Sequence, residues 1–117
     1  MPFDEKTLSR LARAEEVEIV TAGAQPVVIW VVLVGTGVYV RSVRGAKGNW
    51  YRHLVRDGVG ELRVDRARLP IKATRIEDVT TIHAVSLALE QKYRDPDSLA
   101  SMLRSNTLPT TLRLDPR

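Results

Sequence analysis

The feature that most limits the possible folds is an apolar run rich in β-branched residues, VVIWVVLV at residues 27–34. Valine and isoleucine favour extended strands, and an unbroken run of this length is typical of a strand buried on both faces. A helix that spans a bilayer needs roughly 20 apolar residues, so the run is too short to cross a membrane. We therefore predict one interior strand over residues 26–34 of a soluble, sheet-based domain.

The sequence on both sides of this run continues the β pattern. Gly35-Thr36-Gly37 predicts a turn, after which apolar and other side chains alternate along a strand at residues 38–43. Further strands are predicted at residues 17–22, 61–66, 69–79 and 110–114. Pro70 favours a sheet edge or a strand start, because proline cannot donate a hydrogen bond to a neighbouring strand.

Helices are predicted from capping residues and apolar stripes. Asp4 is a candidate N-cap for a helix at about residues 5–15, and Asn49 is one for a helix at residues 50–57 that ends before Gly58. A helix at about residues 81–94 is expected to lie over the sheet, and Asp95-Pro96 starts another. With 117 residues the chain has room for one core, so we predict a single α+β, mainly β domain over residues 1–117.

Composition excludes several classes of site. The chain has no cysteine and only two histidines, which leaves no disulfide, no thiolate chemistry and no basis for a metal site. The first ten residues carry acidic side chains rather than a basic and then apolar signal, so we expect a cytoplasmic protein without membrane attachment. A formal net charge of +4 favours anionic partners.

The positive charge is concentrated in YVRSVRGAKGNWYRHL, residues 39–54, which contains four basic side chains and no acidic one. This stretch joins a strand end, a glycine loop and a helix N-terminus, and that combination offers backbone N–H groups and fixed cations to a phosphate. Trp50 is placed either to cover the ring of a nucleotide-like ligand or to pack beneath the helix. The segment therefore predicts an anion-binding recess.

Several spaced motifs resemble an uncharacterised bacterial family known only as domain of unknown function 2255. They are YVRSVRG, GNWYRHL, a glycine-flanked strand pair, EQKYR and TTLRLDPR, and they cover most of the chain from about residue 28 onward. That family is similar to the split β-barrel flavin-binding proteins, which include pyridoxamine-phosphate oxidases and deazaflavin-dependent nitroreductases. The resemblance implies a split β-barrel of about six antiparallel strands with covering helices, and FMN or a deazaflavin coenzyme as cofactor.

The resemblance also implies roles for seven residues. By position, Arg41, Ser42 and Arg44 would anchor the cofactor phosphate. Gly45 and Ala46 would allow the backbone to approach the ring, and Trp50 and Tyr51 would form the wall of the pocket. No catalytic residue is assigned, because the cofactor itself would carry the chemistry.

Three functions are compatible with these observations. The leading hypothesis is a homodimer that binds FMN or a deazaflavin in a groove between subunits and acts as an oxidoreductase on an unidentified substrate. The second is a non-catalytic dimer for protein interaction or small-ligand binding, in which the apolar strand with Trp30 forms the interface. The third and weakest is nucleic-acid binding through the basic residues near Trp50. Whether the protein is an enzyme stays open.

Overall fold

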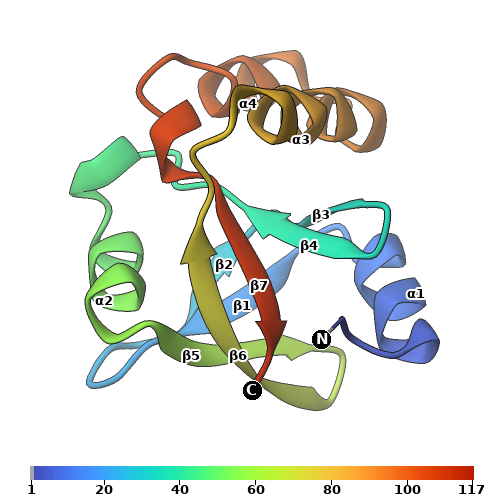
Figure 1. Ribbon diagram of the computed structural model, residues 1–117, viewed down its shortest axis with the longest axis vertical. Helices are drawn as coiled ribbons and strands as arrows, with labels where there is room; N and C mark the ends of the chain where they lie inside the picture. Colours follow the sequence, from blue (N-terminus) through green and yellow to red (C-terminus); the bar gives the residue numbers. More distant parts are fainter. Residues whose placement is uncertain (1) are drawn as a thin grey trace.

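The computed structural model describes residues 2–117, which form one antiparallel sheet of seven strands curled into a half-barrel, with four helices around it (Figure 1). The strands are β1 (Val17–Val20), β2 (Val27–Ile29), β3 (Val32–Val34), β4 (Gly37–Val40), β5 (Val59–Val64), β6 (Ala67–Arg75) and β7 (Leu112–Pro116). The helices are α1 (Glu5–Arg13), α2 (Asn49–Asp57), α3 (Val79–Lys92) and α4 (Pro96–Met102), with 3₁₀ turns η1 (Gly45–Lys47) and η2 (Leu108–Thr110).

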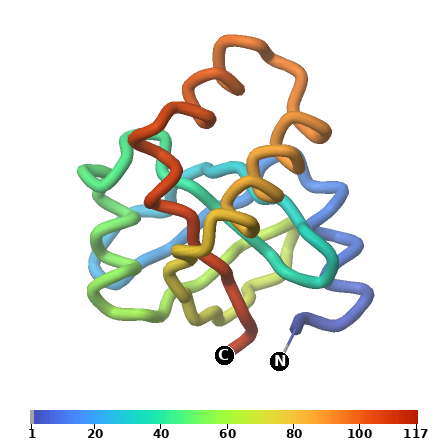
Figure 2. Tube along the Cα trace, turned by 45° about the horizontal axis from the view of Figure 1, so that its top comes forward, coloured from blue at the N-terminus to red at the C-terminus, as the bar shows by residue number. Residues whose placement is uncertain are grey.

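The sheet order is β2-β1-β5-β6-β7-β4-β3, and each neighbouring pair is antiparallel. Helices α3 and α4 cover one end of the half-barrel, while α1 and α2 lie on opposite flanks (Figures 1 and 2). The predicted α+β, split-barrel-like fold is confirmed, with seven strands where about six were expected. Among residues 2–117, no helix is long and apolar enough to cross a membrane.

The prediction of one buried strand over the apolar run is wrong. The run breaks after Ile29, and its two halves, β2 and β3, lie at the two opposite edges of the sheet. Val31 is fully buried at this crossover, but Val28 is 56% exposed. The backbone of Val31 is hydrogen-bonded by side chains instead of by a strand: Tyr93 Oη accepts from its N–H (3.1 Å), and Lys92 Nζ donates to its carbonyl (2.6 Å). Residues far along the chain therefore decide where the run breaks.

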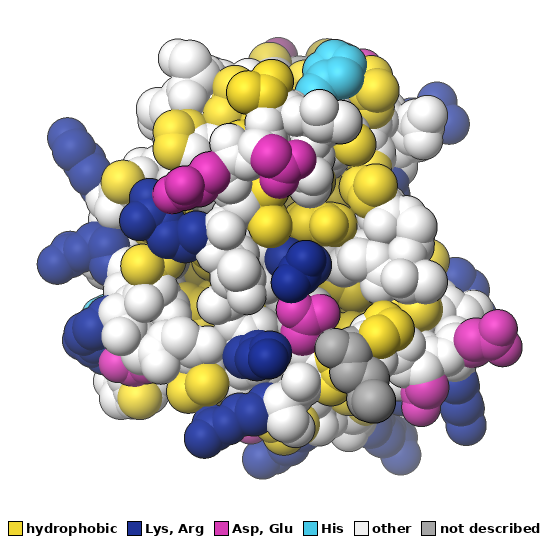
Figure 3. All heavy atoms as spheres, viewed as in Figure 1, with side chains coloured by type: hydrophobic (Ala, Val, Ile, Leu, Met, Phe, Trp, Pro, Cys, Tyr) yellow, Lys and Arg dark blue, Asp and Glu magenta, His cyan; other side chains and the backbone are white. Residues whose placement is uncertain are grey.

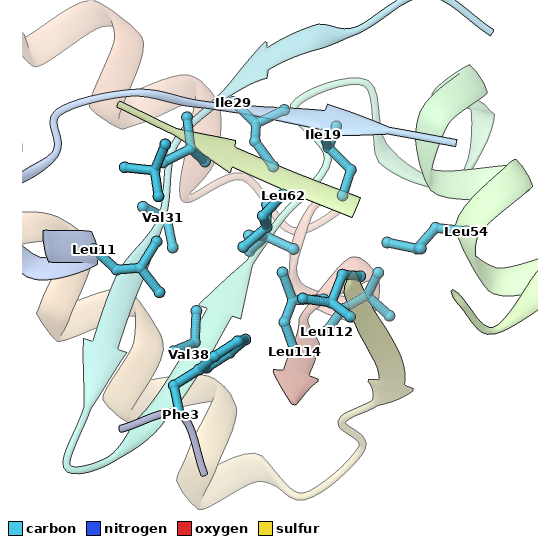
Figure 4. Close-up of a cluster of buried hydrophobic side chains, with 14 of the residues drawn as sticks. Phe3, Leu11, Ile19, Ile29, Val31, Val38, Leu54, Leu62, Leu112 and Leu114 are labelled. Carbon is cyan, nitrogen blue, oxygen red and sulfur yellow. The ribbon is translucent and has the colours of Figure 1, made fainter. Parts of the chain in front are cut away.

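Two clusters of buried apolar side chains hold the fold together. The larger one fills the inside of the curled sheet, where Ile19, Leu62 and Leu114 meet Leu11 of α1 and Leu54 of α2 (Figure 4). The smaller one fixes α3 and α4 to β3 and β4, and its buried members are Val32, Tyr39, Val85, Leu89, Tyr93 and Met102. Burial of one such side chain is worth about 1.5–3 kcal/mol relative to exposure. Helices α2 and α4, which border the pocket described below, are thus each packed on one of these clusters.

The capping predictions are confirmed for α1 and α4 and wrong for α2, while the cap on α3 was not predicted. Asp4, Asp78 and Asp95 accept from backbone N–H groups in the first turns of α1, α3 and α4, at 2.8, 2.9 and 3.2 Å. The predicted N-cap Asn49 is instead the first residue of α2, and Gly48 occupies the cap position without a side-chain hydrogen bond. No carboxylate therefore neutralises the start of α2.

Pro70 does not lie at a sheet edge, because β6 is the central strand of the sheet. Its carbonyl accepts from the N–H of Arg117 at 3.1 Å, on the side of β6 that faces β7. The N–H that proline lacks would point to the same side. Since β7 ends at Pro116, the missing donor interrupts no hydrogen bond of the sheet.

Candidate functional site

A pocket of about 490 Å³ lies where the segment after β4 meets β2, the start of α2 and helix α4. Turn η1 packs beside η2 at this end of the molecule (Figure 1). The pocket is lined by Glu16, Val27, Val28, Ile29, Trp30, Arg41, Ser42, Val43, Arg44, Gly48, Asn49, Trp50, Ser98, Ser101 and Met102. Its size is within the range of about 300–1,000 Å³ found for small-molecule and cofactor sites.

Arg41 is the unusual residue of this pocket, because it is a buried cation without an anionic partner. It directly follows β4 and is only 2% exposed. Its Nε donates to Thr111 Oγ1 (2.9 Å) and its Nη2 to the carbonyl of Ile82 (2.7 Å), both of them neutral acceptors. Its Nη1 is buried and has no hydrogen-bond partner among residues 2–117.

The burial of Arg41 affects its pKa but not its charge at neutral pH. Burial lowers the pKa of Arg41 to about 10, which still leaves the guanidinium charged at neutral pH. None of the ion pairs between described residues includes it. A buried donor without a partner costs about 1–3 kcal/mol, and such groups are rare in folded proteins. Among residues 2–117, Nη1 of Arg41 is the one buried side-chain nitrogen or oxygen that makes no hydrogen bond.

Ser42 is buried beside Arg41, but its hydrogen bonds stay within the protein. Its N–H donates to Thr110 Oγ1 (3.0 Å), and its hydroxyl donates to the carbonyl of Gly45 (2.8 Å). Because the single hydroxyl proton is already donated, Ser42 shapes the loop and has only acceptor capacity left for a ligand. Gly48 packs on it so closely that a Cβ at this position would overlap Ser42 Oγ.

The N-terminus of α2 contributes to the same end of the pocket. Its cap residue Gly48 and its first two residues, Asn49 and Trp50, are lining residues. The first N–H groups of a helix lack acceptors within the helix and carry a partial positive charge. Arg41, the exposed Arg44 and this helix start bring positive charge to the lining, in which Glu16 is the one carboxylate; an excess of positive charge suits a phosphate.

Four of the seven residues expected at the site lie together, and three do not. Arg41, Ser42, Arg44 and Trp50 line the pocket, whereas Gly45, Ala46 and Tyr51 are not among its lining residues. Gly45 is buried against Asn106 with a φ of 68°, and the side chain of Ala46 is exposed. Tyr51 is 6% exposed and belongs to the main core, in edge contact with Trp50 at 6.3 Å between ring centroids.

The other wall of the pocket was not anticipated from the sequence. Trp30 comes from the crossover between β2 and β3, and Ser98, Ser101 and Met102 come from α4. No local motif marks these residues, since they meet the segment 41–50 only through the tertiary fold. Trp30 alone carried a visible signal, as an aromatic residue inside an aliphatic run.

Charge and metal-ligand chemistry identify no second site. On the face shown in Figure 3, Lys and Arg side chains are spread over both the middle and the margins, with acidic side chains among them. Three or more side chains suited to hold a metal ion do not come together anywhere in residues 2–117. The unpaired Arg41, rather than overall charge, therefore singles out this pocket.

Solved structures with the same fold come from several bacteria. A conserved hypothetical protein from Mycobacterium tuberculosis superposes with a TM-score of 0.65 at 12% identity, over 96% of this chain and 78% of that one. A candidate pyridoxamine 5'-phosphate oxidase from Listeria innocua gives 0.60 at 12% identity, over 94% and 88%. A candidate 5-nitroimidazole antibiotic resistance protein from Bacteroides thetaiotaomicron gives 0.56 at 15% identity, over 97% and 80%.

These likenesses establish the fold alone, because identity is low throughout. No curated protein matches the sequence. The family described as "Uncharacterized protein conserved in bacteria (DUF2255)" matches residues 7–114, in agreement with the resemblance noted in the sequence. The chain therefore belongs to the DUF2255 family.

Proposed function

We propose that this protein binds FMN or a related deazaflavin in the pocket beside Arg41, with the cofactor phosphate at Arg41, Arg44 and the start of α2. The observation that carries the proposal is Nη1 of Arg41, a buried and charged donor without a partner in the described chain, on a residue that lines the pocket. Pyridoxamine-phosphate oxidase-like proteins are flavin-related in general, and the likeness to one of them supports the same class of ligand.

The residues present fit a ligand with a phosphate at one end and a flat ring at the other. Arg41 and Arg44 offer charge-assisted hydrogen bonds at the positive end. Away from that end the lining is mostly apolar and aromatic, with Val28, Trp30 and Met102 among its members. A pocket with a few convergent polar groups in a mainly apolar wall is typical of cofactor sites.

The reaction class follows from the ligand. A bound flavin or deazaflavin supplies hydride-transfer chemistry, and we propose that the protein is an oxidoreductase on this basis. The chain itself would anchor the phosphate through Arg41 and Arg44 and keep water from the ring with the apolar wall. No acid or base of the protein has to be named for these roles.

We further propose a homodimer that covers the mouth of the pocket. Val27, Val28 and Val43 are 38%, 56% and 47% exposed, and all three line the pocket. Strand β2, which carries two of them, is an edge strand with unpaired backbone groups. Light scattering combined with size-exclusion chromatography tests the dimer, and a Val28→Lys variant should shift it to monomer. A wild-type protein that stays monomeric at all concentrations would remove this part of the proposal.

Titration with FMN and with a deazaflavin coenzyme, followed by absorbance and fluorescence, tests cofactor binding. The Arg41→Met and Arg44→Met variants should bind about 10- to 150-fold more weakly, since a charge-assisted hydrogen bond is worth about 1.5–3 kcal/mol. Arg68→Met, an exposed position on β6 outside the pocket, is the matched control and should bind like wild type. Absence of binding to wild type at millimolar ligand would refute the proposal.

A further inference from the structure

Trp30 makes the closest aromatic contact of the described chain, and it does so on the pocket wall. Its indole stacks on the ring of Tyr93 with centroids 3.8 Å apart and an interplanar angle of 3°. Trp30 is only partly buried and is a lining residue of the pocket. Because Tyr93 covers one face of the indole, a ligand ring could stack only on the opposite face.

Tyr93 is itself held firmly in place. Its hydroxyl accepts from the N–H of Val31 (3.1 Å) and donates to the carbonyl of Glu15 (2.6 Å). Burial raises the pKa of Tyr93 to about 12, so the hydroxyl keeps its proton over the physiological range. These bonds fix the end of the Tyr93 side chain, and the indole packs on a ring that is anchored at its hydroxyl.

Lys92 also contacts the ring of Tyr93. Its Nζ lies 5.4 Å from the centroid of the Tyr93 ring, within the range of a cation–π contact. The same ammonium donates to the carbonyls of Val31 (2.6 Å) and Leu11 (3.2 Å). The ammonium therefore contacts both the Tyr93 ring and the backbone next to Trp30.

We infer that Trp30 is the platform on which the planar ring of the ligand stacks, and that Tyr93 is the positioning residue that holds this platform. The inference rests on the proposed function and adds to it the residue that binds the ring. A fixed indole with one face already covered loses little conformational freedom when a second ring stacks on it. Trp50 has a different environment, since it packs against the main core and meets Tyr51 edge-on.

Three probes separate the two ends of the pocket: FMN, riboflavin, which has the ring without the phosphate, and inorganic phosphate. In Trp30→Leu, the dissociation constants of FMN and riboflavin should rise about fivefold or more, as expected for a lost aromatic stack, while phosphate binding stays as in wild type. Trp30→Phe keeps a ring and should recover most of the riboflavin affinity. Unchanged riboflavin binding in Trp30→Leu, or an equal loss of phosphate binding, would overturn the inference.

A fluorescence experiment needs no disruptive substitution at the platform. Trp50→Phe leaves Trp30 as the one indole of the chain, because the sequence has two tryptophans. Saturation of this variant with riboflavin should quench most of the indole emission, and emission that stays above half of its starting value would count against stacking on Trp30.

The role of Tyr93 is tested with a matched pair of substitutions in the same apolar cluster. Tyr93→Phe removes the hydroxyl that bonds Val31 and Glu15, whereas Tyr39→Phe removes the hydroxyl of a buried tyrosine that makes no side-chain hydrogen bond within residues 2–117. Tyr93→Phe should weaken riboflavin binding about threefold or more and reduce the near-UV circular dichroism of the stacked pair, with Tyr39→Phe close to wild type in both. Equal behaviour of the two variants would refute the positioning role.

The outcomes distinguish this inference from the proposed function. One outcome is that wild type binds riboflavin as tightly as FMN and fails to bind phosphate. That result refutes the phosphate site at Arg41, and a loss of riboflavin binding in Trp30→Leu would still support the platform. If Arg41→Met weakens FMN and phosphate but Trp30→Leu weakens neither flavin, the proposed function stands and the platform is refuted. Failure of wild type to bind all three probes would overturn both.

Discussion

Replacement of Arg41 by methionine should separate stability from ligand binding. The variant loses two hydrogen bonds to neutral acceptors, worth about 1.5–3 kcal/mol each when the donor is charged. It also removes a buried charge: burial lowers the pKa of Arg41 from 12.5 to about 10, which corresponds to a penalty of about 3 kcal/mol. The two effects nearly cancel, so the free energy of unfolding should fall by about 0–3 kcal/mol.

The effect on ligand-induced stability should be much clearer. At a ligand concentration 100 times its dissociation constant, binding to the folded state stabilises wild type by about 2.7 kcal/mol. If Arg41→Met binds FMN 10- to 150-fold more weakly, the same concentration stabilises the variant by only about 0.3–1.4 kcal/mol. Urea unfolding of both proteins, with and without FMN, measures these differences directly.

Two results would refute this reasoning. A variant that is destabilised by more than about 4 kcal/mol would identify Arg41 as a structural link between β4, α3 and the start of β7. A variant that FMN stabilises as much as wild type would show that the ligand does not use the guanidinium.

Three further predictions concern stability alone. Burial lowers the pKa of Lys92 from 10.5 to about 8, so between pH 8 and 10.5 the unfolded chain keeps a proton that the folded chain has lost. The free energy of unfolding, measured with urea, should therefore rise with pH in this window. The Lys92→Met variant should lack that rise. Gly45→Ala should lose about 1–2 kcal/mol or more, because φ is 68° and the new Cβ would lie 3.0 Å from the carbonyl oxygen of Asn106. Gly58→Ala, with φ of 76° and open space, is its control and should lose only about 1 kcal/mol in the same assay. Asp78→Ala should lower the melting temperature through a cap worth about 1 kcal/mol, and no change would mean that the cap on α3 is not formed in solution.

Much of the fold can be predicted from the sequence because its signals are local. Asp4 and Asp95 each cap a helix three residues upstream of the N–H that they bind, so both helix starts can be predicted from a few letters. The alternation after the turn at residues 35–37 likewise indicates β4. Confirmed elements of this kind depend on neighbours along the chain.

The break in the apolar run could not be predicted in this way. Nothing between Val27 and Val34 marks a boundary, and the groups that satisfy the backbone of Val31 come from Lys92 and Tyr93, more than 60 residues later. The same distinction between local and distant contacts decides which residues of the candidate site could be predicted. Arg41 and Trp50 were found because they share one short segment, whereas Trp30 was missed because its partner Tyr93 is distant in sequence.

The position of β7 has a consequence for how the chain reaches this structure. Strands β2, β1, β5 and β6 form one half of the sheet, β4 and β3 form the other, and β7 is the strand that joins them. Residues 112–116 pair with residues about 40 and about 75 positions earlier, so the ladder closes through long loops. During synthesis the four-stranded half and the two-stranded half cannot join into one sheet until this strand leaves the ribosome, so the complete sheet forms only after that moment.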